Sequence, residues 1–180
     1  MNPQFYLEKL KNSEEFEKFK KENPSAFLCS AFFSIDKSGG NKSLTTSSKR
    51  GQRKGKDNKQ HFDFFNEGKI FSFQVEDNCK KIELENFAGK IPSRISEKVN
   101  FEFRAIEKLI EKSMQKENIK NEIQKILFSL QNIDEVNSLI GTIFISGMGI
   151  INFKIDLNKN EIIDFEKKSI FDVLKVIKGK

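Results

Sequence analysis

The residues best equipped to bind a ligand lie in one strongly basic segment. Between Lys37 and Gln60 the sequence has eight lysines and arginines and a single acid, Asp57, so this segment has a net charge of +7. The whole chain has a net charge of +6, which leaves the remainder close to neutral. Lysine and arginine neutralise phosphates and release counterions, so salt-dependent binding of polyanions is predicted. The candidate polyanion-binding residues are Lys49, Arg50, Arg53, Lys54, Lys56 and Lys59.

The same segment also has the composition of a solvated loop. Leu44 is its only large apolar side chain, and Gly51 and Gly55 make a helix unfavourable. Because residues 37–60 can bury so little surface, we expect them to form a long disordered hairpin loop. They include no aromatic side chain on which a base could stack, so the loop alone should not recognise a sequence. Residues 47–60 are therefore either a phosphate-binding loop or a solubilising one.

A catalytic pair is the next chemistry to consider. His61, the one histidine, lies two positions before Asp63, and strand alternation would put both side chains on one face. No recognisable nucleophile accompanies them, and one histidine with two distant cysteines does not have the spacing of a zinc site. Cys29 alternates with apolar neighbours and is predicted to be a buried, inert thiol. We expect no enzyme, metal or cofactor, and an enzyme using His61 and Asp63 is the least favoured alternative.

Length and composition define the class of protein. The chain has 180 residues, of which 37% are hydrophobic and 32% charged, so we expect one globular domain over 1–180. The longest apolar stretch, 139–151, is too short for a transmembrane helix, so no membrane span is expected. The N-terminus lacks an apolar signal core, and two cysteines cannot form a disulfide framework. A reduced, cytoplasmic location is predicted.

The first half, residues 1–86, reads as helix followed by strands. Asn2 and Pro3 suit the start of a helix that continues toward Pro24, and Ser13 could cap a second helix after a break. Compact aromatic runs then predict strands on either side of the basic loop. The expected strands span 25–36, 61–66, 69–77 and, more briefly, 80–86.

The second half, residues 96–170, repeats this order. An apolar stripe predicts a helix over 101–118, and Ser169 could cap a short closing helix. Short links between the intervening strands require antiparallel neighbours. Helices packed on one face of antiparallel meander strands make the predicted class α+β, with one sheet or two. The expected strands span 125–132, 138–146, 149–156 and 161–168.

The second half resembles a PepSY-like module of the cystatin-like type. The resemblance is carried by the helix "FRAIEKLIEKSM" and the hairpin "NFKIDLNKNEIIDFE", in which Asp156 stands where the family's aspartate ends a strand. Asn160 occupies a position usually held by glycine, and asparagine tolerates the left-handed conformation that such a turn needs. Leu157 replaces a usually small residue. The whole chain is also similar to small uncharacterised archaeal proteins in which "ENP" precedes an aromatic strand.

What the resemblance implies is a binding or inhibitory element rather than an enzyme. The predicted function is therefore a non-enzymatic binding module that contacts an unidentified protein partner through an exposed sheet face or edge strand. A nucleic-acid-associated protein that uses the basic loop is the alternative. The sequence leaves the oligomeric state open.

Overall fold

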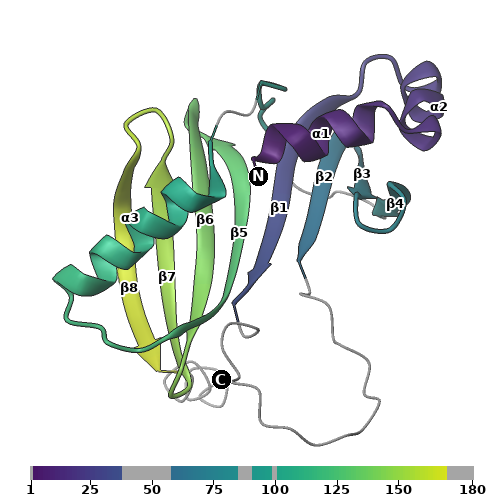
Figure 1. Ribbon diagram of the computed structural model, residues 1–180. Helices are drawn as coiled ribbons and strands as arrows, with labels where there is room; N and C mark the ends of the chain where they lie inside the picture. The colour runs from purple at the N-terminus through teal and green to yellow at the C-terminus, as the bar shows by residue number, and fades with distance from the viewer. Residues whose placement is uncertain (1, 38–57, 85–90, 99–100, 170–180) are drawn as a thin grey trace, which may run out of the picture.

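The computed structural model describes residues 2–37, 58–84, 91–98 and 101–169 (Figure 1). Along the chain, two short helices precede four strands, and a longer helix precedes four more. The helices are α1 (Pro3–Lys11), α2 (Glu14–Glu22) and α3 (Phe103–Lys116). The strands are β1 (Phe27–Asp36), β2 (Lys59–Asn66), β3 (Lys69–Gln74), β4 (Lys80–Leu84), β5 (Ile123–Ile133), β6 (Val136–Ile145), β7 (Gly149–Asp156) and β8 (Glu161–Ser169).

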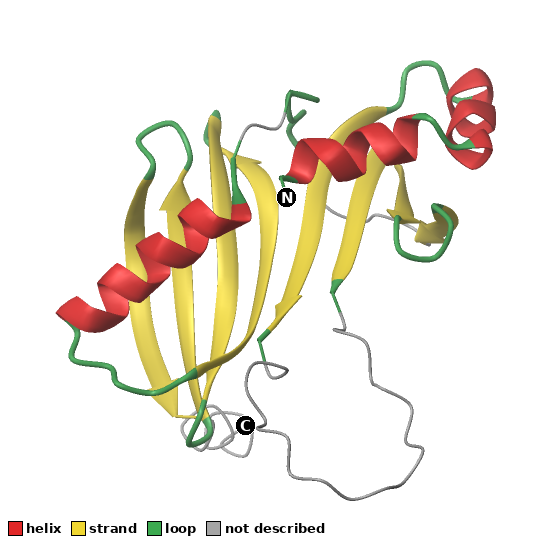
Figure 2. Cartoon of the chain, viewed as in Figure 1, coloured by secondary structure: helices red, strands yellow, loops and turns green. Residues whose placement is uncertain are grey.

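All eight strands form one antiparallel sheet (Figure 2). The strand order is β4-β3-β2-β1-β5-β6-β7-β8, so each half of the chain contributes a meander. The two meanders join where β1 pairs with β5, with Phe33 opposite Phe128 and Ser30 opposite Gln131. This pairing makes one continuous sheet from strands that are distant in the sequence.

The predicted break in the first helix is confirmed. The Asn2 side chain accepts a hydrogen bond from the Phe5 N–H at 3.0 Å, and this caps α1. A second cap follows directly, because Ser13 Oγ accepts from the Phe16 N–H and starts α2. The break lets each short helix place its own apolar residues against the sheet, with Leu7 and Leu10 buried in α1.

One aromatic-rich core lies between the helices and the sheet. Phe16 and Phe19 of α2 contact Phe64 and Phe73, with ring centroids 4.9 to 6.1 Å apart. The predicted stripe of the longer helix is confirmed, because α3 buries one apolar face against the other half of the sheet. Its buried residues are Ile106, Ile110 and Met114, with Phe103 and Leu109 packed against the same core.

The turn between β7 and β8 has the backbone that the sequence predicted. Asp156 is buried at the end of β7, and its Oδ1 accepts hydrogen bonds from the N–H groups of Asn158 at 2.8 Å and Lys159 at 3.1 Å. Asn160 has a φ of 54°, within the left-handed region. The carboxylate therefore closes the turn, and asparagine supplies the conformation for which glycine is more usual.

The predicted α+β class was wrong. Strands occupy 48% of the described residues and helices 23%, and every strand belongs to the single large sheet. The helices contribute less than expected because the first one divides at Ser13, whereas β5 extends past both predicted ends and β6 begins two residues before its predicted start. The fold is dominated by a sheet that three short helices cover on one face. The expected loop over 37–60 and the expected helix from Ser169 to 180 fall mainly outside the described residues.

None of the described helices is long and apolar enough to span a membrane.

Candidate functional site

The sheet has a second face that no described helix covers, and we call it the outer face. Figures 1 and 2 show α1 and α3 crossing the sheet on the same side. Strand alternation sends Phe33 and Phe128 toward the helices, and it sends their chain neighbours Phe32 and Leu127 to the outer face. The outer face is thus defined by residues that alternate with the core.

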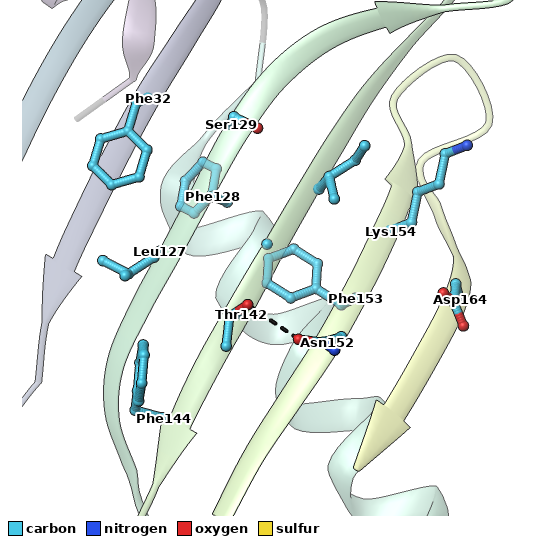
Figure 3. A pocket seen from close by; sticks show the side chains of 12 residues that line it. Phe32, Leu127, Phe128, Ser129, Thr142, Phe144, Asn152, Phe153, Lys154 and Asp164 are labelled. Atoms are coloured by element: carbon cyan, nitrogen blue, oxygen red, sulfur yellow. Dashed lines mark hydrogen bonds between the residues drawn. The ribbon is translucent and has the colours of Figure 1, made fainter. Parts of the chain in front are cut away.

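A hollow of about 530 Å³ lies on the outer face over β1 and β5 to β8 (Figure 3). Its apolar lining is contributed by four strands, β1, β5, β6 and β7, and two short polar side chains lie between the larger ones. Thr142 Oγ1 donates a hydrogen bond to Asn152 Oδ1 at 3.1 Å, so these two side chains satisfy each other. Lys154 and Asp164 give the hollow a charged side. The large apolar residues of the lining are Phe32, Leu127, Phe128, Ile140, Phe144 and Phe153.

The hollow follows from where long and short side chains fall in the register. Ser129 and Thr142 are short, and they are flanked by Phe32, Phe144 and Lys154, which are long. Side chains stand roughly perpendicular to a sheet, so short residues surrounded by long ones leave a depression. The site is therefore a shallow, mostly apolar depression in the sheet surface.

The strand β6 is apolar on both of its faces. Leu139 and Ile143 are fully buried against the helices, whereas Ile140 and Phe144 are half-buried on the outer face. Continuous apolar runs are typical of strands that are covered on both sides. The apolar run "LIGTIFI" is the feature of the sequence that could have indicated a strand covered on both faces. The strand order was needed to show that this strand lies close to Phe32.

His61 and Asp63 share the outer face, as predicted, but the structure gives each a different partner. His61 Nε2 lies 3.1 Å from Glu76 Oε1, and the His61 ring is 5.8 Å from the ring of Phe32. Asp63 accepts a hydrogen bond from Ser30 Oγ. Within the described residues, no group of three or more histidine, cysteine, aspartate or glutamate side chains could hold a metal ion.

The candidate polyanion-binding residues are mostly beyond the described part of the chain. Lys49, Arg50, Arg53, Lys54 and Lys56 lie outside the described residues, and only Lys59 can be placed, at the first position of β2. Lys59 pairs in register with Ser34 of β1. The proposal of a phosphate-binding loop at 47–60 therefore rests on the sequence alone.

Cys29 is buried at an irregularity in β1, and its position differs from the predicted alternation. The register shifts between Leu28 and Ser30, so that Leu28 and Ala31 both reach the core. The Cys29 thiol donates to the Asp63 carbonyl oxygen at 3.3 Å. Burial, and secondarily the negative charge of Asp63, raises the pKa of Cys29 to about 12.

We expect Cys29 to be almost unreactive in the folded protein. Its pKa exceeds the ordinary value of 9.0, so at pH 8 its thiolate fraction should be about a thousandfold smaller than that of a free thiol. Measuring the reaction of a Cys79→Ser variant with a thiol-specific disulfide reagent, with and without denaturant, checks this. A fast reaction under native conditions would contradict the buried position.

The same raised pKa predicts a loss of stability at high pH. The unfolded thiol loses its proton near pH 9, whereas the folded thiol keeps its proton to about pH 12. The folded state therefore binds more protons in this window, so the free energy of unfolding should fall as the pH rises through it. A Cys29→Ala variant should lack this contribution when urea unfolding is compared at pH 8 and pH 10.

Comparisons with known proteins place the chain only loosely. No family model matches it, and no curated protein matches it. Among solved structures, the chain is similar to a "putative lipoprotein" from Clostridium difficile 630, with a TM-score of 0.40 and 13% identity over 86% of this chain and 91% of that one. This similarity carries no conclusion about function, and the PepSY-like resemblance of residues 96–170 stays a prediction.

Proposed function

We propose that this protein is a non-enzymatic binding module whose contact surface is the hollow on the outer face. The single observation that carries the proposal is the apolar lining of this hollow on a face that no described helix covers. Monomeric proteins rarely leave a large contiguous apolar patch without a use, and the half-buried side chains of this hollow lie next to one another on neighbouring strands. The partner is a protein that inserts an apolar side chain or segment into the hollow.

Two aromatic residues are the expected anchors of the contact. Phe32 on β1 and Phe144 on β6 line the hollow from two different strands. Aromatic side chains are enriched among the residues that contribute most of the binding energy at protein interfaces. Lys154 and Asp164 at the charged side would set the orientation of the partner rather than supply most of the affinity.

Strand addition at a sheet edge is a weaker explanation of the same role. The edge strand β8 presents Glu166, Lys167 and Lys168 along its length, and its register with β7 shifts between Lys154 and Ile155. Charged residues and bulges are the features that keep an edge strand from pairing with another chain. The face of the sheet is therefore favoured over its edge.

Truncating the two anchors should remove binding without unfolding the protein. We expect Phe32→Ala combined with Phe144→Ala to weaken capture of the partner by about thirtyfold to a thousandfold, since each anchor contributes about 1–2 kcal/mol. A photoreactive group at Ser129 on the outer face, used in extract of the source cells, identifies the partner by mass spectrometry.

Two controls make this experiment decisive. Phe5→Ala removes a phenylalanine that is 55% exposed on α1, and this variant should bind normally. A photoreactive group at the exposed Lys108 of α3 should not crosslink the same protein. Equal crosslinking from both positions, or unchanged capture by the double variant, would refute binding through the outer face.

Polyanion binding through residues 47–60 is the second candidate function, and the +7 charge of residues 37–60 favours it. The test is filter binding of nucleic acid at low and moderate salt, using the full chain and a variant that lacks residues 41–58. Affinity that falls with salt and disappears with the deletion would support this function. Affinity that the deletion leaves unchanged would exclude the loop.

A further inference from the structure

A small cavity lies on the helix side of the sheet, where the two halves of the chain meet. Its volume is about 130 Å³, and its lining comes from α1, β1 and β2 of the first half and from α3 of the second (Figure 2). The hollow on the outer face lies on the opposite side of the sheet, so the cavity is a separate site that does not depend on the proposed function. Concave spaces with apolar walls and a few polar groups are where small molecules bind.

Three aromatic rings form the apolar wall of the cavity. The Phe103 ring centroid lies 6.3 Å from that of Tyr6 and 5.3 Å from that of Phe33. These rings belong to α3, α1 and β1, so only the folded chain brings them together. Aromatic rings offer a large apolar surface, and their negative faces attract a positive charge. The wall therefore suits a small apolar group that carries a positive charge.

Gln60 gives the cavity a buried amide that lacks a protein partner. This residue is 7% exposed and pairs in register with Phe33. Its backbone N–H donates to Glu76 Oε2 at 3.0 Å, whereas no described residue hydrogen-bonds to its side-chain amide, which lines the cavity. Buried polar side chains are normally hydrogen-bonded, because losing water without gaining a partner is unfavourable. The amide therefore calls for a hydrogen-bonding group inside the cavity.

Glu107 gives the cavity a carboxylate. It follows Phe103 by one turn of α3, so both side chains lie on the same face of this helix. Glu107 Oε2 accepts a hydrogen bond from Lys37 Nζ at 2.6 Å. A carboxylate has two oxygens with about four acceptor positions, so this ion pair leaves room for a second donor. A ligand with N–H groups can therefore reach both Glu107 and the Gln60 amide oxygen.

We propose that this cavity binds a small alkylammonium ion, which is a primary amine in its protonated form. The alkyl group lies against the three rings, and the ammonium group donates to Gln60 and Glu107. Four water molecules occupy about 120 Å³ in the liquid, so a ligand of about four heavy atoms fits the cavity. An anion of the same size would face the Glu107 carboxylate, and a neutral molecule would gain nothing from that charge.

An NMR titration of the nitrogen-15-labelled full chain at pH 7 and constant ionic strength tests this site. Isopropylammonium is the probe, and the side-chain NH₂ signal of Gln60 is the readout. We expect this signal to shift and saturate with a Kd of about 0.1–10 mM, as befits so small a ligand. Isopropanol has the same shape without the charge and should bind about tenfold more weakly, and acetate should not bind measurably.

Two outcomes of this titration would reject the proposal. A shift that does not saturate would mean that the cavity holds only water. Equal affinities for isopropylammonium and isopropanol would mean that the cavity has no preference for a cation. Neither outcome bears on the hollow, because its lining faces the other side of the sheet.

Substitutions that keep the shape of the cavity test the two polar contacts, with the backbone amide of Phe103 as the readout. Glu107→Gln removes the charge and should weaken binding by about tenfold, and Gln60→Met removes the amide and should weaken it by about fivefold. The rest of the amide spectrum shows that each variant is folded. Either variant alone, if it is folded and binds as the wild type does, would overturn the contact assigned to its residue and with it the proposal.

Two further variants separate a direct contact from a general effect of charge. Glu111→Gln removes an exposed carboxylate one turn farther along α3, outside this cavity, and should leave the affinity unchanged. Lys37→Met removes the cation that now pairs with Glu107, so it should strengthen binding by about threefold or more. Weaker binding in Lys37→Met, or an equal loss in Glu111→Gln and Glu107→Gln, would refute a cation site at Glu107.

Discussion

Phe33→Ala is expected to lower the free energy of unfolding by about 3–5 kcal/mol, which is the range for removing a buried phenylalanine. Phe33 is 1% exposed and lies on β1 at the junction of the two meanders. Its ring centroid lies 5.3 Å from those of Phe103 and Phe128 and 5.9 Å from that of Phe62. A domain of this size has about 5–15 kcal/mol of stability in total, so the variant should lose a large fraction of its stability and unfold at a much lower urea concentration.

Phe32→Ala is the matched control for this prediction. Phe32 is the chain neighbour of Phe33 and faces the hollow, where it is only half-buried. Phe32→Ala should lower the free energy of unfolding by about 1–1.5 kcal/mol, because the Phe32 side chain buries less apolar surface on folding than the Phe33 side chain does. Urea unfolding followed by circular dichroism measures both variants, and this probe suits a chain without tryptophan. Equal losses would mean that the outer face is buried as deeply as the core.

Gly141→Ala should destabilise the protein by about 3 kcal/mol or more, at the upper end of the usual cost of overpacking. A Cβ at position 141 would lie 2.3 Å from the Leu127 carbonyl oxygen, 2.6 Å from Phe128 Cβ and 2.7 Å from the Phe153 ring. Leu127 and Phe128 belong to β5, and Gly141 pairs with Phe128 and Phe153 in the register. The backbone of the sheet centre would have to move, and thermal unfolding should show this as a large fall in Tm.

Gly149→Ala provides the comparison. A Cβ at position 149 would lie 2.8 Å from both Cγ1 and Cδ1 of Ile145, and these side-chain atoms can shift more readily than a backbone oxygen. The stability of this variant should stay within about 1 kcal/mol of the wild type, because alanine is also favoured over glycine within a strand. If both variants lost the same stability, close packing at the sheet centre would not be the cause.

These two experiments separate folding from binding. Phe33 and the position of a Cβ at Gly141 face the core under the helices, whereas Phe32 and Phe144 face the hollow on the outer face. Phe32 and Phe33 are nevertheless adjacent in the chain. Substitutions on the outer face should therefore change capture of the partner more than they change stability. This division is a direct consequence of strand alternation, which sends successive side chains to opposite faces.

Local features of the sequence were sufficient to predict most of the elements. The stripe of α3, the caps at Asn2 and Ser13, and the conformation of Asn160 all depend on residues within a few positions of one another. Strand β3 ends at Gln74, three residues before the predicted end, because the chain turns there. Such errors at element ends are small because hydrogen-bonded caps and alternation are short-range effects.

The candidate site could not be predicted in the same way. Phe32 comes near Ser129 and Ile140 only because β1 pairs with β5 and β5 pairs with β6. The predicted burial of Cys29 is confirmed, but the irregularity at this position depends on the pairing of β1 with β2 and could not be read from one strand. Sequence analysis proposed the basic residues of 47–60 as the candidate site, because a cluster of charges can be recognised without any knowledge of contacts.

The sequence by itself determined where the chain forms helices and strands, that consecutive strands are antiparallel, and that the surplus positive charge lies within residues 37–60. Only the tertiary structure decided that the two meanders become one sheet, that strands outweigh helices, and that apolar side chains from β1, β5 and β6 meet around one hollow. The physical reason is that propensities and caps act between near neighbours, whereas the pairing of Ser30 with Gln131 depends on packing of the whole chain against a shared aromatic core.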